Sequence, residues 1–168
     1  MKKYKCIIFD ADKTLRYCIV PGQPTPNRPG EWKLLENVQS KLTSFNWGSP
    51  QEGKTGFGIA SNQGGVGAGY ISRNMAFQLL QDTFVAAFGF GPPAEVIQMC
   101  TPKPQENSDC RKPKPAMLLK IMDFWKVIPA ETLFVGDMES DRKTAQNAGC
   151  DFIWAKDFFN IQPKLPKS

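Results

Sequence analysis

The sequence predicts an α/β fold in which one parallel sheet is covered by helices on both faces. Short apolar runs typical of buried strands alternate five times along the chain with longer segments of helical periodicity. This alternation favours a single doubly wound, Rossmann-like, five-stranded parallel sheet. We expect one domain over residues 1–168, because this length suits one domain and 41% hydrophobic residues can form a core.

The first half of the chain is expected to contain two strands and one helix. The first strand is predicted at residues 4–9, and the proline-rich segment 20–32 that follows is expected to be irregular and to frame a site entrance. Apolar residues at helical spacing predict an amphipathic helix over 34–45. A short second strand is then expected at 57–60.

The second half is expected to repeat the same alternation. Ser72 is a suitable N-cap for a helix that ends near Gly89. Another helix is expected over 115–127, and Gly149 is expected to end the last predicted helix. The remaining strands are predicted at residues 95–100, 132–136 and 151–155.

The composition excludes several kinds of chemistry. The chain contains no histidine, which rules out a Ser-His-Asp triad, a Cys-His pair and histidine-bound zinc within it. Its five cysteines are scattered without a CxxC motif, so we expect reduced thiols. An enzyme of this composition has to use carboxylates, lysines and hydroxyl groups.

Charge and hydropathy indicate the kind of partner. The net charge of +5 suits an anionic partner such as a phosphorylated metabolite or a nucleic acid, although a solvated basic surface explains it equally well. No apolar run approaches the roughly 18 residues needed to cross a bilayer. The apolar stretch near the N-terminus is too short for a secretory leader. We therefore expect a cytoplasmic protein with no membrane association, and the sequence gives no sign of an obligate protein partner.

Polar residues follow the predicted strands at the points where ligands bind to a doubly wound sheet. Such sheets bind ligands beyond the carboxyl ends of their strands. The polar residues at these strand ends are Asp10 and Asp12; Ser61, Asn62 and Gln63; Arg111, Lys112 and Lys114; and Asp137 and Asp141.

This set of side chains suits phosphoryl transfer. Crowded carboxylates raise each other's pKa unless a cation lies among them, and oxygen ligands favour Mg²⁺. An aspartate beside such a metal is a competent nucleophile toward phosphorus. A second carboxylate two residues further along can protonate the leaving oxygen and later deprotonate the attacking water. Lysine and serine side chains can hold the phosphoryl oxygens.

The segments "DADKT", "SNQ", "RKP" and "GDMESD", in this order, resemble the four motifs of the haloacid dehalogenase superfamily of phosphohydrolases. The resemblance implies an aspartyl-phosphate mechanism in which Asp10 is the nucleophile and Asp12 the general acid and base. It assigns catalysis to Asp10, Asp12 and Lys112, substrate binding to Thr14, Ser61, Asn62 and Arg111, and Mg²⁺ binding to Asp10, the backbone carbonyl of Asp12, Asp137 and, in support, Asp141.

Two further segments narrow the resemblance. "SNQGGVGAG" and "CRKPKPAM" are similar to the branch that includes heptose bisphosphate and histidinol phosphatases, and polynucleotide 3′-phosphatase domains share the "NQ" loop and "RKP". The glycine-rich stretch does not match the G-x-G-x-x-G pattern of a dinucleotide site.

The chain departs from this branch in two places. A zinc loop of three cysteines and one histidine is usual before "RKP". Here only Cys100 and Cys110 match it, with Pro102 and Ser108 at the other ligand positions. We therefore expect no structural zinc, and we expect Cys100 and Cys110 to be buried thiols. The second departure is Lys13, which occupies a position where glycine is usual.

Three functions remain open at this stage. No segment is long enough for a large cap domain, so the site is expected to be open. The first candidate is a Mg²⁺-dependent hydrolase of a small sugar-type phosphate, and the second is a phosphatase of nucleic-acid 3′ ends. The third is a catalytically silent binding protein, against which the full set of motif residues argues.

Overall fold

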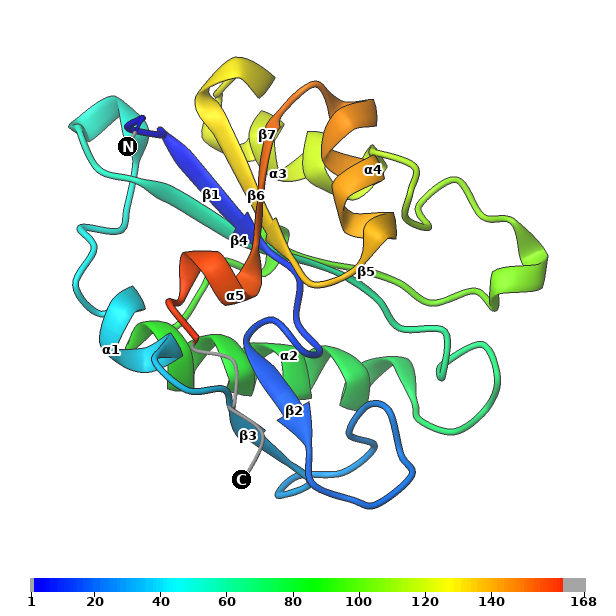
Figure 1. Ribbon diagram of the computed structural model, residues 1–168. Helices are drawn as coiled ribbons and strands as arrows, with labels where there is room; N and C mark the ends of the chain where they lie inside the picture. Colours follow the sequence, from blue (N-terminus) through cyan, green and yellow to red (C-terminus); the bar gives the residue numbers. More distant parts are fainter. Residues whose placement is uncertain (1, 162–168) are drawn as a thin grey trace, which may run out of the picture.

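A five-stranded parallel sheet forms the centre of the computed structural model, which describes residues 2–161 (Figure 1). The strand order is β5-β4-β1-β6-β7, so strand order reverses next to β1 and the doubly wound prediction is confirmed. The predicted domain, 1–168, extends beyond the described residues at both ends. The strands of this sheet are β1 (Cys6–Phe9), β4 (Gly56–Asn62), β5 (Ile97–Cys100), β6 (Thr132–Gly136) and β7 (Asp151–Trp154).

Helices cover both faces of the sheet (Figure 1). One face carries α1 (Val38–Leu42), α2 (Arg73–Phe88) and α5 (Ala155–Phe158), and the other carries α3 (Ala116–Trp125) and α4 (Glu139–Ala148). Short 3₁₀ helices lie at Pro50–Glu52, Ala94–Val96, Pro104–Glu106 and Pro129–Glu131. Within residues 2–161, no helix combines the length and the apolar composition required to cross a membrane.

The packing of β1 and β4 fixes the position of the strand ends that carry the polar motifs. Phe9 is fully buried, and its ring meets Phe88 of α2 and Phe158 of α5 edge-on, with centroids 5.7 and 5.5 Å apart. On the other face, a Cβ atom at Gly58 would lie 2.8 Å from Ile121, so this glycine allows α3 to approach closely. Asp10 thus follows a strand that is packed tightly on both sides.

The predicted ends of α2 and α4 are confirmed. Ser72 caps α2 through its hydroxyl, which accepts a hydrogen bond from the Met75 amide at 3.1 Å. Gly89 and Gly149 follow the two helices with φ angles of 90° and 80°, a left-handed conformation that glycine adopts without a steric penalty.

The prediction for residues 34–45 was wrong in extent. Leu34 lies in a strand, β3 (Trp32–Leu34), which pairs antiparallel with β2 (Arg16–Cys18) in a second, two-stranded sheet. The helix is only the five-residue α1, because pairing with the β2 strand holds the chain extended through Leu34. Trp32 is therefore also part of a strand, not of the irregular proline-rich segment.

The prediction that Cys100 and Cys110 are free thiols was also wrong. The two residues form a disulfide, with their Cα atoms 5.4 Å apart. The chain between them turns back through the 3₁₀ helix Pro104–Glu106, which returns Cys110 to the end of β5. The remaining cysteines are free and are Cys6, Cys18 and Cys150.

Candidate active site

A buried ion cluster lies at the carboxyl ends of β1 and β6. The Lys112 ammonium is 2.8 Å from Asp10 Oδ1 and 2.8 Å from Asp141 Oδ1, and it also donates to the Ala60 carbonyl at 3.1 Å. All three charged side chains are at least 90% buried. The structure therefore brings together the predicted nucleophile, the predicted phosphate-neutralising lysine and one predicted metal-site aspartate.

The turn between β6 and α4 holds Asp141 in this cluster. Asp141 Oδ2 accepts hydrogen bonds from the backbone amides of Asp137 at 3.1 Å and Met138 at 3.0 Å, at the helix start where amides lack intrahelical partners. Gly136 makes room for this arrangement, because a Cβ atom there would lie 2.5 Å from the Cβ of Asp141. The glycine of the "GD" dipeptide in the fourth motif is thus needed because a larger residue would clash with Asp141.

Three carboxylates are close enough to share a cation. One oxygen each of Asp10, Asp137 and Asp141 lies within 4.8 Å of the others, and the Thr14 hydroxyl is 3.3 Å from Asp10 Oδ2 and 3.4 Å from Asp137 Oδ1. Such an all-oxygen set fits a hard divalent cation. Both oxygens of Asp10 and both oxygens of Asp141 already accept hydrogen bonds, so within residues 2–161 Asp137, which accepts through Oδ1, offers the freer oxygen.

The environment shifts the pKa values of the clustered groups. Burial raises the pKa of Asp10 well above its ordinary value, and the Asp141 charge adds to this although Lys112 acts against it. Burial likewise raises the pKa of Asp137. Burial acts to lower the pKa of Lys112, but Asp10 and Asp141 together outweigh it and raise that pKa.

These shifts predict that the metal-free protein is less stable at pH 8 than at pH 5. In the folded protein, Asp10 and Asp137 stay protonated at pH values above the ordinary carboxyl pKa. At the same pH values, these two residues are ionised in the unfolded chain. Their stabilisation is present at low pH and is lost as pH rises through the raised pKa values. The chain has no histidine, so few other groups titrate in this window. The measurement is the free energy of unfolding in urea against pH, in EDTA.

The Asp137→Asn variant is the control for this prediction, and it should reduce the pH slope in EDTA. Excess Mg²⁺ should also reduce the slope of the unmodified protein, because a bound cation favours ionised carboxylates. A free energy of unfolding that rises between pH 5 and pH 8 in EDTA contradicts the prediction.

Asp12 lies outside the carboxylate cluster, where three donors hold its side chain. Arg16 Nε is 2.9 Å from Asp12 Oδ1, while the Thr25 hydroxyl at 2.9 Å and Gln63 Nε2 at 3.1 Å both donate to Oδ2. The expected metal contact of Asp12 is through its backbone carbonyl, and this remains a prediction. The donor Thr25 belongs to the proline-rich segment, so this segment does reach the site.

Arg16 connects Asp12 to helix α2. Its guanidinium is 1% exposed and also donates to the Leu79 carbonyl at 3.0 Å and to the Thr83 hydroxyl at 2.9 Å. Within residues 2–161, the hydrogen bonds of the Arg16 side chain go either to Asp12 or to one turn of α2. Arg16 thereby fixes one oxygen of the predicted proton-transfer group.

Replacement of Arg16 by methionine (Arg16→Met) should destabilise the protein by about 3–5 kcal/mol, because it removes one partner of a buried ion pair. The matched control is Arg142→Met, which removes an arginine that pairs with Glu139 on the surface of α4. That change should leave the free energy of unfolding almost unaltered. Urea unfolding of both variants measures the difference, and equal losses would contradict the assigned role of Arg16.

The predicted phosphate-binding and substrate-binding residues lie around the cluster. Ser61 is buried at the end of β4, and its hydroxyl accepts from Gln63 Nε2 at 2.8 Å. Asn62 Oδ1 accepts from the Lys112 backbone amide at 3.1 Å and so ties the second motif to the third. Arg111 is not part of the ion cluster: its Nη1 is buried without a hydrogen-bond partner among residues 2–161.

A cavity of about 730 Å³ lies beside the loop that follows Ser61 and Asn62. Thr25 forms part of its wall, so the wall includes a hydrogen-bond donor to Asp12, the predicted proton-transfer group. It lies between three loops and is lined by Val20, Pro21, Gly22, Gln23, Pro24, Thr25, Asn27, Gly64, Gly65, Ala68, Tyr70, Lys103, Pro104 and Gln105.

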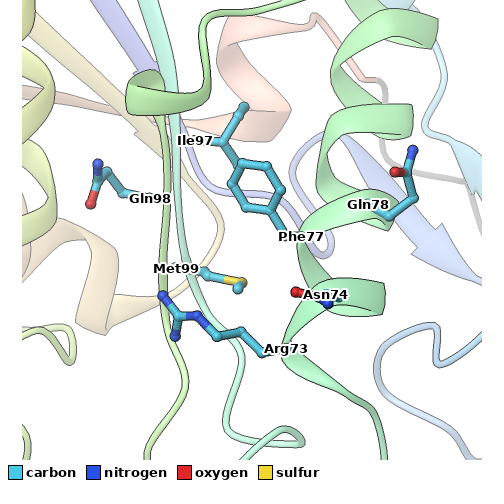
Figure 2. A pocket seen from close by; sticks show the side chains of 7 residues that line it. All are labelled: Arg73, Asn74, Phe77, Gln78, Ile97, Gln98 and Met99. Atoms are coloured by element: carbon cyan, nitrogen blue, oxygen red, sulfur yellow. The ribbon is translucent and has the colours of Figure 1, made fainter.

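A second hollow, of about 430 Å³, lies elsewhere on the molecule, between α2 and the edge strand β5 (Figure 2). Phe77, Ile97 and Met99 form its apolar part, and Arg73 lies at one end, where Nη1 donates to the Thr101 hydroxyl at 3.3 Å. None of the predicted site residues lines it, so it is not the candidate active site.

Sequence reasoning did not identify Arg16 and Thr25 as site residues. Arg16 had one available signal, because it follows Asp12 by four residues, but the β-hairpin that buries it was not predicted. The structure also explains why glycine is usual at the position of Lys13. This residue has φ = 65°, a left-handed conformation that favours glycine, and its exposed side chain points to no partner in the ion cluster.

Comparison with known proteins agrees with this geometry. A family model described as haloacid dehalogenase-like hydrolase matches residues 98–155. The fold resembles a crystal structure of D,D-heptose 1,7-bisphosphate phosphatase from B. bronchiseptica complexed with magnesium and phosphate. The TM-score is 0.70 and the identity 26%, over 88% of this chain and 78% of that one. The chain is thus similar to haloacid dehalogenase-like hydrolases over residues 98–155, and its fold is similar to that of a phosphatase over most of the described structure.

Two curated relatives are similar to this chain over about half of its length. The D-glycero-beta-D-manno-heptose-1,7-bisphosphate 7-phosphatase of Helicobacter pylori is 32% identical over 93 residues, which are 54% of this chain and 53% of that protein. The histidine biosynthesis bifunctional protein HisB of Actinobacillus pleuropneumoniae is 33% identical over 94 residues, which are 55% of this chain and 26% of that protein. The chain thus spans about half the length of the heptose phosphatase and about a quarter of HisB.

Proposed function

We propose that the protein hydrolyses a small phosphorylated sugar in two steps, with Asp10 as the group that first accepts the phosphoryl group. The observation that carries this proposal is the contact of buried Asp10 with the Lys112 ammonium, 2.8 Å away at the end of β1. A carboxylate held beside a cation is positioned to attack phosphorus, and the cation then meets the charge of the phosphoryl oxygens.

The surrounding side chains have separate roles in this proposal. Ser61, buried at the end of the neighbouring strand β4, offers a hydroxyl to a phosphoryl oxygen. Asp12 gives a proton to the leaving oxygen and then removes one from the attacking water. Arg16, Thr25 and Gln63 orient Asp12 for both steps.

We further propose that Asp10 and Asp137 hold Mg²⁺, with Asp141 in support. Their oxygens meet within one small volume, which supports a site for a hard cation. When bound, Mg²⁺ supplies positive charge that keeps these carboxylates ionised and stabilises the phosphoryl oxygens. Asp141 positions the turn after β6 through its two backbone hydrogen bonds and also orients Lys112.

The substrate part of the proposal rests on the cavity and the relatives. The cavity of about 730 Å³, whose wall includes the Asp12 partner Thr25, is within the size range of small-molecule sites. The names of the heptose relatives denote enzymes that act on a sugar bisphosphate. A phosphorylated nucleic-acid end is the second candidate, favoured by the net charge of +5.

A substrate panel tests this proposal. Purified protein with Mg²⁺ would be offered heptose 1,7-bisphosphate, other sugar phosphates and a 3′-phosphorylated oligonucleotide, with phosphate release as the readout and Asp10→Asn as the control. We expect the highest kcat/KM with a sugar phosphate. Faster turnover of the oligonucleotide, with strong salt dependence, would support the second candidate. Release of phosphate from no substrate would contradict both.

A further inference from the structure

The Cys100–Cys110 disulfide closes the segment that leaves the edge strand β5 and returns to α3 (Figure 1). Three residues of this segment, Lys103, Pro104 and Gln105, form part of the wall of the cavity of about 730 Å³. We propose that the disulfide is a redox switch on substrate binding, which holds this wall in place when oxidised and releases it when a dithiol reduces it. The inference rests on the proposed phosphatase function.

Few other contacts fasten this segment to the rest of the protein. Residues 103–107 are exposed. Within residues 2–161, residues 102–109 form hydrogen bonds only with one another and with the chain directly after them, at Cys110, Arg111 and Lys114. The disulfide therefore links the far end of the segment to the end of β5. A link that closes a loop restricts the conformations that the loop can adopt.

The near end of the segment is held without the disulfide. The Thr101 carbonyl accepts a hydrogen bond from the Gly67 amide at 3.0 Å, and a Cβ atom on Gly67 would lie 2.7 Å from that carbonyl oxygen. The Arg73 side chain also donates to the Thr101 hydroxyl at 3.3 Å. Reduction should therefore loosen the later part of the segment, which includes Pro104 and Gln105 of the cavity wall.

Lys112 is anchored independently of the disulfide. Its amide donates to Asn62 Oδ1 at 3.1 Å, and its ammonium lies 2.8 Å from both Asp10 and Asp141. These contacts hold Lys112 at the ion cluster although it follows Cys110 by only two residues. We therefore expect reduction to weaken substrate binding, which raises KM, and to leave kcat nearly unchanged.

The switch is a thiol–disulfide exchange with a dithiol reductant. Cys100 is fully buried and Cys110 is partly exposed, so the attack falls on Cys110 Sγ. The thiolate of the reductant bonds to this sulfur while the bond between the two cysteines breaks, and Cys100 leaves as a thiolate that takes up a proton. The second thiol of the reductant then displaces Cys110, which also takes up a proton. Two electrons and two protons thus pass to the protein, and the dithiol is left as an intramolecular disulfide.

The three other cysteines differ in their access to reagents. Burial raises the pKa of the Cys6 and Cys150 thiols, which keeps them in the unreactive protonated form. Cys18 is partly exposed, and its sulfur accepts a hydrogen bond from Gln23 Nε2 at 3.6 Å. Cys18 is therefore the matched control position for effects of a reductant on this protein.

Kinetics and hydrogen–deuterium exchange of the protein in its two redox states test the proposal. The protein would be equilibrated with oxidised or with reduced dithiothreitol, and alkylation after denaturation should find three and five thiols, respectively. With Mg²⁺ and the best sugar phosphate of the panel, we expect reduction to raise KM roughly three- to tenfold, because the loosened wall has to be ordered on binding. The exchange of residues 102–109 should become faster, and kcat should change by less than about twofold.

Two variants serve as controls. Cys110→Ser should have the high KM of the reduced protein in both media, and Cys18→Ser should respond to dithiothreitol as the unmodified protein does. Five thiols after oxidation, or the same KM and the same exchange of residues 102–109 in both states, would overturn the switch. A loss of the response in Cys18→Ser would also overturn it. If neither redox state hydrolyses any substrate of the panel, the proposed phosphatase function fails; if the oxidised protein turns substrate over and reduction leaves KM unaltered, only the switch fails.

Discussion

The Asp10→Asn variant is expected to lose phosphatase activity by about 10⁴-fold or more in kcat while it still folds. Asparagine has nearly the shape of aspartate, but its amide cannot attack phosphorus and form a covalent intermediate. The variant also keeps Lys112 paired, because Asp141 Oδ1 remains 2.8 Å from the ammonium. The measurement is phosphate release with Mg²⁺ and the best substrate of the panel, together with the free energy of unfolding.

The control for this prediction is Asp151→Asn. Asp151 is an exposed aspartate at the start of β7, and it accepts a hydrogen bond from Tyr4 at 2.6 Å, far from the ion cluster. The Asp151→Asn variant should keep the phosphatase activity of the unmodified protein. Retained activity in Asp10→Asn would remove Asp10 from the role of nucleophile. Loss of activity together with loss of folding would call for a comparison of the two variants at a temperature where both are folded.

The Lys112→Met variant is expected to be the most destabilised single-site variant of the cluster. Lys112 compensates two buried carboxylates, and its removal should cost about 3–5 kcal/mol of unfolding free energy at neutral pH in EDTA. It should also reduce kcat by about 10²–10³-fold, since a preorganised charge near the phosphoryl oxygens is lost. Because burial raises the pKa of Asp10, this carboxyl takes up a proton as pH falls and the repulsion between the two side chains is relieved, so the destabilisation should shrink at low pH.

Lys114→Met serves as the matched control for Lys112→Met, two residues further along the same loop. Its ammonium is partly exposed and lies 3.6 Å from the fully exposed Asp109. Its loss should change stability little. Denaturant unfolding at pH 5 and pH 8 gives the comparison. A Lys112→Met protein as stable as the unmodified one at pH 8 would show that the cluster does not depend on this cation.

The parts of the fold that the sequence predicted are those set by local periodicity. The strand at Thr132–Gly136 has the predicted bounds, because five consecutive buried positions between turn signals leave little choice of element. The polar motifs were then predicted to lie together because the carboxyl ends of the strands meet at one edge of a doubly wound sheet. For this reason Asp10, Lys112 and Asp141, which are far apart in the chain, were predicted to meet.

The features that the sequence did not predict depend on contacts between distant residues. The β2–β3 hairpin has strands of three residues each, too short for a periodic signal, and the same apolar residues also fit a helix. The burial of Arg16 follows from this hairpin and from the carbonyl of Leu79, which lies 63 residues away. The Cys100–Cys110 disulfide needs the return of the chain after β5, which spacing alone does not reveal.

The most direct test of the account is to trap the phosphoryl group on the protein during turnover. Enzyme and labelled substrate, mixed with Mg²⁺ and quenched in acid within the first turnover, would be digested and the labelled peptide identified by mass spectrometry. We expect the label on Asp10, and no label in the Asp10→Asn variant. Substrate turnover with no labelled peptide, or with the label on another residue, would contradict the assignment of Asp10 as the nucleophile.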